Sequence, residues 1–310
     1  MRAIHCFSSR PAMAGRTAAG LFDNVSPKIP EATLLFMKLS ALQWRRTNGS
    51  VKLYTDTLMK KFLARYDLLS CWNEVDTDVM EDFYRDNPDI RHDSFWAASK
   101  FAAYRLETAP FVCIDTDFAV WKPIDFSGDF MFAHWESIED GDASYPALTT
   151  LNCPKGYNLI VDDSALFKTK ACNMSITYFG NDDFKNEFTR LALDFMTGNN
   201  VDAAHRYATP EILYSEQRLP LALLLKRKLS FRPILDLTWS PLQFKITHCP
   251  PEYKHWFFSN LDTRKPFTHL WFHKKYLAEN VTANAEYCDQ LCALIADAED
   301  GLREDAADFQ

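Results

Sequence analysis

Two carboxylates separated by one residue follow a short apolar run in the middle of the chain. Residues 111–114 (FVCI) are apolar, and Asp115 and Asp117 come directly after them. Alternation in a strand puts Asp115 and Asp117 on the same face. Carboxylates this close repel each other unless a cation compensates them, and their hard oxygen atoms suit Mn²⁺ or Mg²⁺. The pattern predicts a divalent metal site, although an Asp-x-Asp triplet alone also commonly caps a turn.

A second group of candidate ligands lies near the end of the chain, in the segment THLWFHKKY. His269 offers an imidazole, and Lys274 and Lys275 offer point charges that suit phosphate oxygens. His269 and His273 stand four residues apart, which on a helix suggests zinc, but the Glu of an HExxH motif is absent. A zinc hydrolase is therefore disfavoured. The alternative for His269 is a partly buried histidine within an aromatic cluster.

Alternating strands and helices must position these groups. Apolar runs predict a first strand in AIHCFSS (residues 3–9), a second over 51–56 and a short third strand within 72–79. Helical spacing predicts helices over 32–45, 58–66, 93–106 (with Asp93 or Ser94 as the N-cap), 183–197 and 211–228. Loops and short strands are expected over 125–163. This alternation favours the α/β class, with chemistry at the strand ends.

The segment SFWAASKFAAYR, a Pro and then FVCIDTDFAVWKPID resembles the central part of GT-A glycosyltransferases. It is most similar to a group of little-characterised bacterial GT-A-like proteins. The resemblance extends to IHCFSSRP, LYTD, CNMSI, SEQ and HLWFHKK. It implies one GT-A-like (Rossmann-like) domain over residues 1–310, with a mixed, mainly parallel sheet flanked by helices. The acidic segment 284–307 is expected to be a helix with a solvated surface.

The resemblance also implies roles for the metal and diphosphate groups. Asp117 would be the main protein ligand of Mn²⁺ or Mg²⁺, and Asp115 would contact the ribose, or the metal through water. His269 would be a further metal ligand. Lys274 or Lys275 would meet the diphosphate, although Phe272 replaces a Gly that often follows such a His and leaves open which lysine does so.

Further donor-binding residues are expected on the first two strand ends and on the preceding helix. The loop with Ser8 and Ser9, and the loop with Tyr54 and Asp56, would hold the base and ribose. Tyr54 fits a stacking role and simple core packing equally well. Lys100 lies on the helix before the Asp-x-Asp strand, where it fits a donor contact or a snorkelling surface lysine equally well.

Two residues are candidates for the sugar or acceptor side of the site. Asn173, in CNMSI, resembles the position where GT-A enzymes present a side chain to the sugar or acceptor. Glu216 is a candidate for a sugar contact, or for the base that deprotonates an acceptor hydroxyl. The alternative for Glu216 is a first-turn charge that suits the helix dipole.

Composition excludes some classes of function. The 310 residues carry a net charge of -8 and a sequence pI near 5.5, which argues against an extended nucleic-acid surface. The eight scattered cysteines form no CxxC pair and read as reduced thiols. No secretory signal or membrane span is evident, so a cytoplasmic protein is expected, with loose association with a membrane-bound acceptor still compatible.

These features together predict a metal-dependent glycosyltransferase that uses a nucleotide-sugar donor, with a UDP-sugar favoured, and an unidentified saccharide or other hydroxyl acceptor. One alternative is a metal-dependent phosphohydrolase or nucleotidyltransferase. A dehalogenase-type phosphatase is disfavoured, because its Asp-x-Asp follows the first strand of the core, whereas two strand signals precede this one. The other alternative is a protein of the same fold that binds a glycan or nucleotide without transfer.

Overall fold

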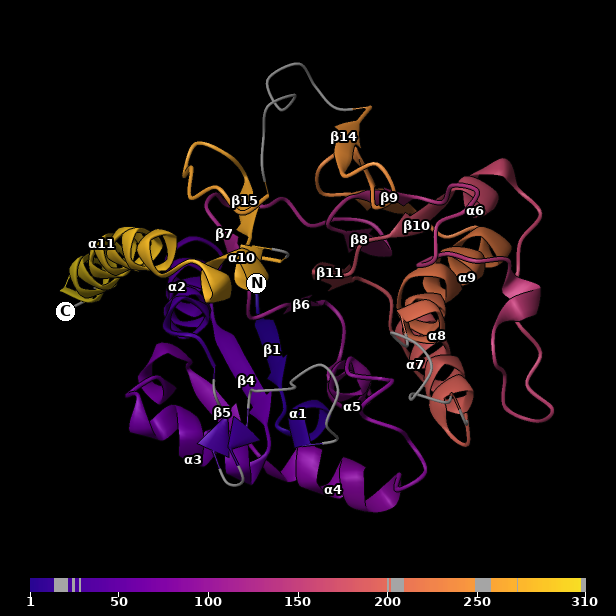
Figure 1. The fold of residues 1–310 in the computed structure, drawn as a ribbon, viewed down its shortest axis with the longest axis horizontal. Helices are drawn as coiled ribbons and strands as arrows, with labels where there is room; N and C mark the ends of the chain where they lie inside the picture. The colour runs from indigo at the N-terminus through magenta and orange to yellow at the C-terminus, as the bar shows by residue number, and fades with distance from the viewer. Residues whose placement is uncertain are drawn as a thin grey trace.

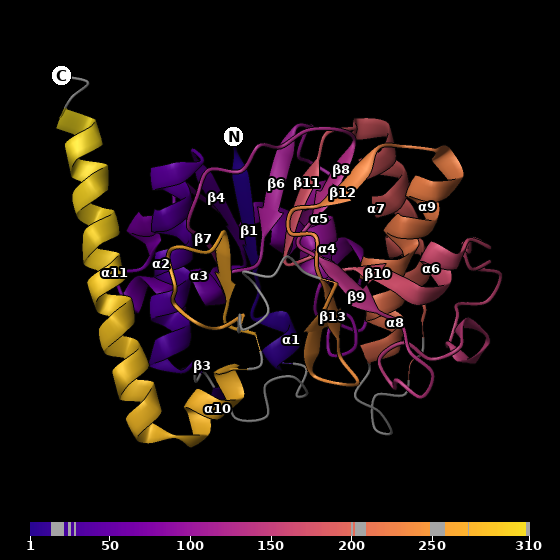
Figure 2. The same cartoon turned by 90° about the horizontal axis from the view of Figure 1, so that it is seen from above.

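A computed structural model describes residues 1–13, 22–23, 26–27, 29–199, 201, 209–248, 258–271 and 273–307. Its centre is a seven-stranded sheet with the order β12-β8-β11-β6-β1-β4-β5 (Figure 1; β12 is labelled in Figure 2). The strands are β1 (Ala3–Phe7), β4 (Val51–Thr55), β5 (Glu74–Asp76), β6 (Phe111–Ile114), β8 (Phe130–Phe132), β11 (Ile176–Phe179) and β12 (Phe231–Pro233). Only β11 runs antiparallel to its neighbours in this sheet. The predicted class, a mixed and mainly parallel α/β sheet flanked by helices, is confirmed.

The strands at the centre of the sheet are buried because helices cover both faces. Every residue of β4, β6 and β11 is buried, as expected for strands covered on both faces, and β6 (FVCI) is continuously apolar. Successive side chains of β1 enter different cores, with Ala3 on one face and Ile4 on the other. One core contains α2 (Glu31–Thr47), α3 (Thr57–Arg65) and α11 (Val281–Ala307), and the other contains α4 (Asp78–Asp86), α5 (Ala98–Tyr104), α7 (Asp182–Met196) and α9 (Leu219–Arg227).

Smaller elements complete the described chain. A second sheet has the order β10-β9-β13-β14, and two short ribbons pair β15 with β7 and β2 with β3. These strands are β2 (Phe22–Asp23), β3 (Ser26–Pro27), β7 (Phe118–Val120), β9 (Trp135–Ser137), β10 (Lys170–Cys172), β13 (Thr238–Ser240), β14 (Lys245–Thr247) and β15 (Phe267–His269). The short helices are α1 (Arg10–Met13), α6 (Ala165–Thr169), α8 (Thr209–Leu213) and α10 (His273–Glu279), with 3₁₀ turns at Leu69–Cys71 and Leu148–Thr150.

Most predicted elements are present with small shifts at their ends. The helices expected over 32–45, 58–66 and 183–197 correspond to α2, α3 and α7. Asp56 caps α3 by accepting a hydrogen bond from the Met59 amide (2.9 Å), and Asn181 caps α7 through the Phe184 amide (3.0 Å). The acidic tail forms α11, which begins at Val281 and runs beside α2 (Figure 2).

The structure differs from the predicted elements in three details. The helix expected from Asp93 begins only at Ala98, and Asp93 pairs with Arg91 (3.0 Å). The helix expected over 211–228 is present as α8, a π-helical segment (Tyr214–Arg218) and α9. The strand before the Asp-x-Asp ends at Ile114 as predicted, but the triplet itself is a turn, closed by the Phe118 amide donating to the Asp115 carbonyl (3.0 Å). Strand alternation is therefore not what brings the two carboxylates together.

Among the described residues, no helix combines the length and the apolar character needed to cross a membrane. The seven cysteines within the described part of the chain are all free thiols, and Cys249 lies outside it.

Candidate functional site

The Asp-x-Asp turn lies at the place where the sheet order reverses. From β1 the chain passes to β4 and β5 on one side, and it returns through β6 to β11, β8 and β12 on the other. In open α/β sheets, ligands bind in the crevice at the carboxyl ends of the strands that flank such a switch point. Ser8 and Ser9 follow β1, and Asp115 and Asp117 follow β6, so both predicted loops lie at the carboxyl ends of the two strands that flank the switch point.

Strand pairing then brings the terminal histidine to the turn. The Asp115 amide donates to the Ser175 carbonyl (2.7 Å), which continues the β6–β11 pairing. On the other side, β15 pairs with β7 so that His269 lies opposite Phe118, and the Leu270 amide donates to the Asp117 carbonyl (2.9 Å). The turn is therefore held between two segments that are about 95 residues apart in the sequence.

Asp115, Asp117 and His269 present ligand atoms that all lie within 4.8 Å of one another. The side chains of Asp117 and His269 are buried, whereas that of Asp115 is 28% exposed. The His269 ring stacks on Trp271, with ring centroids 5.1 Å apart and planes 2° apart. Two carboxylates and one imidazole form a donor set that suits Mn²⁺ and Mg²⁺ better than a soft metal. The three predicted metal ligands thus converge, and an ion of this kind fits them chemically.

Lysines also accompany the two carboxylates. Lys274 Nζ lies 2.6 Å from Asp117 Oδ2, and His269 Nε2 lies 3.5 Å from the same oxygen. Burial alone would raise the pKa of Asp117, but Lys274 and His269 outweigh it and hold this pKa well below its usual range. Lys275, in contrast, is exposed. Between the two predicted diphosphate ligands, the fold therefore brings only Lys274 to the carboxylates.

Lys100 is buried between two carboxylates, so it is not a snorkelling surface residue. Its Nζ lies 2.7 Å from Asp115 Oδ1 and 2.7 Å from Glu216 Oε1, and it also donates to the Met174 carbonyl (3.3 Å). Burial would lower the pKa of Lys100, but the two carboxylates outweigh it and hold that pKa well above its usual range. Desolvation raises the pKa values of Asp115 and Glu216, and it outweighs the lowering effect of the Lys100 charge that they share.

Glu216 lies in the π-helical segment rather than in a first helical turn. Its side chain is 8% exposed, so the surface-charge interpretation does not hold. A π-helical turn inserts an extra residue and redirects the side chains that follow, which is why such turns occur often at functional sites. Here it places Glu216 against Lys100 and its neighbour Gln217 against Tyr145.

Asn173 contacts a buried glutamate that the sequence did not single out. Asn173 Nδ2 donates to Glu136 Oε1 (2.5 Å), and Tyr145 donates to Glu136 Oε2 (2.5 Å). Burial raises the pKa of Glu136. Glu136 lies on β9 in HWES, a segment expected only as loop and short strand, and no spacing motif marks it.

The first two strand ends form one hydrogen-bonded unit. Asp56 accepts hydrogen bonds from Ser8 Oγ (3.0 Å), the Ser9 amide (2.5 Å) and Ser9 Oγ (2.8 Å), in addition to capping α3. Tyr54 is 3% exposed and donates to Glu107 (2.6 Å), on the face of the sheet that carries α4 and α5. The structure thus brings Ser8, Ser9 and Asp56 together. Tyr54 packs in the core, in agreement with core packing rather than with stacking on a nucleotide base.

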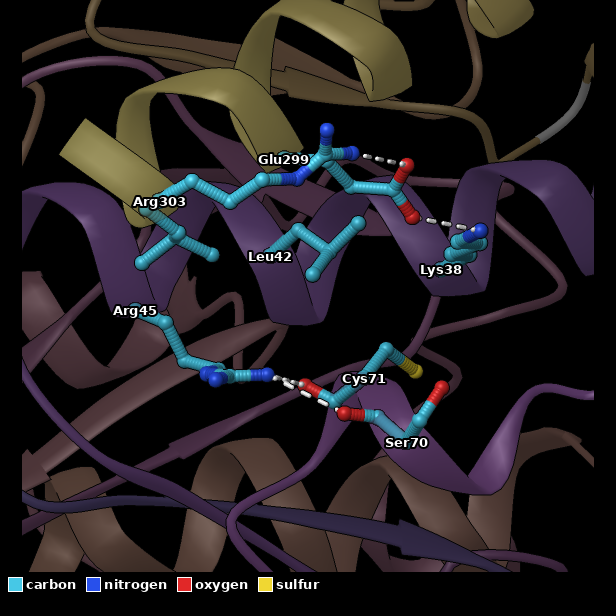
Figure 3. A pocket seen from close by; sticks show the side chains of 8 residues that line it. Lys38, Leu42, Arg45, Ser70, Cys71, Glu299 and Arg303 are labelled. Carbon is cyan, nitrogen blue, oxygen red and sulfur yellow. Dashed lines mark hydrogen bonds and ion pairs between the residues drawn. The ribbon is translucent and has the colours of Figure 1, made fainter. Parts of the chain in front are cut away.

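A cavity of about 300 Å³ lies elsewhere, between α2, the 69–71 turn and α11. Figure 3 shows Glu299 between Lys38 and Arg303, and Arg45 directed at the carbonyls of Ser70 and Cys71. None of the predicted site residues lines this cavity. The effect of Phe272 on the site falls outside the described residues.

The family of unknown function DUF6734 matches residues 29–296, so the chain belongs to that family. A comparison with curated proteins finds no match. Solved structures with similarity include the PaToxG glycosyltransferase (13% identity, TM-score 0.36, 73% of this chain and 69% of that chain). A second is the nucleoside-diphosphate-sugar pyrophosphorylase from Vibrio cholerae RC9 (12% identity, TM-score 0.36, 82% of this chain and 98% of that chain). A third is the inositol-1-phosphate CTP transferase from T. maritima (10% identity, TM-score 0.34, 80% of this chain and 89% of that chain). At these TM-scores the likenesses say nothing about the activity of this chain.

Proposed function

We propose that this member of the DUF6734 family is a metal-dependent glycosyltransferase that moves a sugar from a nucleotide-sugar donor to an acceptor hydroxyl. A UDP-sugar is the favoured donor. The observation that supports the proposal is the convergence of Asp115, Asp117 and His269 at the carboxyl end of β6, beside the switch point of the sheet. Each carboxylate of the Asp-x-Asp pairs with a lysine, Asp115 with Lys100 and Asp117 with Lys274. Such a site offers negative charge for a metal cation and positive charge for a diphosphate.

Asp115, Asp117 and His269 would hold Mn²⁺ or Mg²⁺. When bound, such an ion would neutralise the negative charge that builds on the nucleoside diphosphate as the sugar departs. Lys274, whose side chain is 41% exposed, lies at the rim and would contact diphosphate oxygens. Lys275 is exposed and forms no ion pair with either carboxylate among the described residues, so it serves as a matched control.

The remaining residues would hold the donor and the acceptor. Ser8 and Ser9, fixed by Asp56, would shape the loop that carries the base and ribose. Lys100 would fix Asp115 and Glu216 relative to each other. Glu216 is then available for a hydroxyl of the sugar, because its second carboxylate oxygen is not used by Lys100.

Thermal unfolding in the presence of nucleotides tests the donor site. The full chain is heated with UDP, GDP, CDP or ADP, each with and without Mn²⁺, and the experiment is repeated on Asp117→Asn. Ligand at a hundredfold above its Kd stabilises the native state by about 2.7 kcal/mol. We expect a Mn²⁺-dependent rise of the midpoint with UDP that is absent in Asp117→Asn and retained in Asp125→Asn, a control at an exposed carboxylate. No shift with any nucleotide would overturn the donor site.

Product analysis separates the proposed activity from its alternatives. Incubation with a UDP-sugar and Mn²⁺, without acceptor, should release UDP and free sugar slowly, because water replaces the acceptor hydroxyl at the anomeric carbon. Release of UMP and sugar phosphate would instead indicate a phosphohydrolase. Nucleotide binding without any turnover, with a range of saccharide acceptors present, would indicate a binding protein of this fold.

A further inference from the structure

A chain of buried hydrogen bonds connects Glu136 to His269. Glu136 accepts from Asn173 Nδ2 (2.5 Å), Ser175 Oγ donates to Asn173 Oδ1 (2.5 Å), and Ser175 Oγ lies 3.4 Å from His269 Nδ1. Glu136, Asn173, Ser175 and His269 are each less than 5% exposed. Because water does not reach these groups, their polar atoms must satisfy one another.

The backbone amide of Ser175 sets the direction of this chain. A backbone N–H can only donate, so the Asn173 carbonyl oxygen must face the Ser175 amide (3.1 Å), and this oxygen also accepts from the Ser175 hydroxyl. The Asn173 NH₂ group then faces Glu136 Oε1, and the Tyr145 hydroxyl lies 2.5 Å from Glu136 Oε2.

The proton on His269 follows from this direction. The only hydroxyl hydrogen of Ser175 is used on Asn173, so Ser175 Oγ can act toward His269 only as an acceptor. His269 Nδ1 must therefore carry a hydrogen. In the neutral ring, Nε2 then has a free lone pair, and it faces Asp117 Oδ2, another acceptor, at 3.5 Å. The Nε2 lone pair and the carboxylate oxygen face each other in a buried site, where a proton on Nε2 satisfies both in the absence of metal and a bound cation would satisfy both in its place.

We propose that Glu136, Asn173 and Ser175 are positioning residues that hold His269 in its Nδ1–H tautomer and direct the Nε2 lone pair at the cation site. The proposal rests on the proposed function in assuming that this site takes Mn²⁺ or Mg²⁺. It assigns Asn173 to orientation of a ligand rather than to contact with the sugar. Ring stacking on Trp271 fixes the plane of the imidazole, and the hydrogen-bonded chain selects which nitrogen faces Asp117.

Nuclear magnetic resonance of the ring nitrogens tests the tautomer directly. The full chain is labelled with ¹⁵N-histidine, treated with EDTA and examined at pH 8 by two-bond ¹⁵N–¹H correlation, with His269 assigned by comparison with His269→Gln. We expect the Nδ1–H pattern in the wild type and a shift toward the Nε2–H pattern in Ser175→Ala. Thr177→Val, which removes a buried hydroxyl two residues away in β11, should leave the His269 pattern unchanged. An Nε2–H pattern in the wild type overturns the proposal.

Metal affinity provides a second readout. Loss of a residue that orients a histidine ligand typically costs tenfold to a hundredfold in metal affinity. We expect Mn²⁺ binding, measured by the electron paramagnetic resonance signal of free Mn²⁺, to weaken by that factor in Ser175→Ala and Glu136→Ala, and Ser175→Thr to retain most of the affinity. Unchanged affinity in Ser175→Ala overturns the orienting role.

The two readouts separate this inference from the proposed function. If the wild type binds no Mn²⁺, the proposed metal site fails, and with it the purpose that we assign to the tautomer. If Mn²⁺ binds and the wild-type tautomer is Nε2–H, only the positioning role is overturned. The wild-type spectrum alone decides the tautomer, so the proposal remains testable even where a variant does not fold.

Discussion

Lys274 Nζ lies 2.6 Å from Asp117 Oδ2, so the carboxylate that we propose as the main metal ligand is also paired with an ammonium group. A divalent cation and Lys274 would compete for the charge of this one carboxylate. The lysine is 41% exposed and sits on α10, where its side chain can turn toward solvent or toward a bound phosphate. Binding of the metal and of the diphosphate are thus expected to be coupled through this lysine.

Replacing Lys274 should have opposite effects on the two ligands. In Lys274→Gln, the affinity for Mn²⁺ without nucleotide should rise, because the competing cation is gone, by about twofold to fivefold for a partly exposed pair. The affinity for UDP in the presence of Mn²⁺ should fall, because a phosphate contact is lost. Isothermal titration calorimetry measures both, and Lys275→Gln should match the wild type. A weaker Mn²⁺ affinity in Lys274→Gln would contradict the coupling.

Lys100 should be essential for stability, because it is the only cation that contacts both Asp115 and Glu216 among the described residues. Lys100→Met should lower the free energy of unfolding by about 3 kcal/mol or more, since removal of one partner leaves buried charge uncompensated. Urea denaturation measures this loss.

The double variant Lys100→Met/Glu216→Gln should recover part of the Lys100→Met loss, because one of the stranded carboxylates is gone. Lys168→Met is the control, since Lys168 pairs with Asp163 on the surface (3.5 Å) and should contribute little. Additive losses in the double variant would contradict the coupling between Lys100 and Glu216.

His5 should make the chain less stable in acid. His5 is fully buried between Trp72 and Ser40, and the Trp72 indole donates a hydrogen bond to His5 Nδ1 (3.1 Å). Burial lowers the pKa of His5 to about 3, although the nearby Asp117 charge acts in the opposite direction. In the unfolded chain the pKa of a histidine is about 6.5, so as the pH falls the unfolded state takes up a proton at a higher pH than the folded state does. Stability should therefore be lost below about pH 6.5, by about 2 kcal/mol at pH 5 from this group.

Urea denaturation at pH 5 and pH 7.5 measures this dependence. The difference in free energy of unfolding between the two pH values should shrink in His5→Asn, which can still accept from Trp72. His248→Gln, at an exposed histidine, should leave the difference unchanged. An undiminished difference in His5→Asn would show that other groups cause the acid sensitivity.

The C-terminal helix should be part of the core despite its acidic composition. Leu291 on α11 is fully buried in the cluster that contains α2. Leu291→Ala should lower the free energy of unfolding by about 2 to 5 kcal/mol, through lost burial and the cavity that remains. Cys292→Ala, at an exposed position on the same helix, should have almost no effect. Equal effects of the two changes in thermal or urea unfolding would contradict the packing of α11 on α2.

Local sequence patterns were sufficient for the elements that carry the site. Apolar runs marked β1, β4 and β6, and helical spacing marked α2, α3 and α7, because burial on one or both faces imposes these periods on the residues themselves. The same reasoning placed the start of α5 five residues too early, and it did not reveal the π-helical segment within the predicted helix over 211–228, because one extra residue leaves no clear periodic signature.

The sequence by itself determined that two carboxylates follow a buried strand, and that an imidazole and two lysines lie near the end of the chain. Only the tertiary structure decided which of these groups meet. The pairing of β15 with β7 brings His269 to Asp117, and the position of α10 selects Lys274 over Lys275. Glu136 could not be identified from the sequence, because its role depends on hydrogen bonds to Asn173 and Tyr145, which are 37 and 9 positions away. Contacts over such separations depend on strand register and helix packing, which no local pattern of residue types encodes.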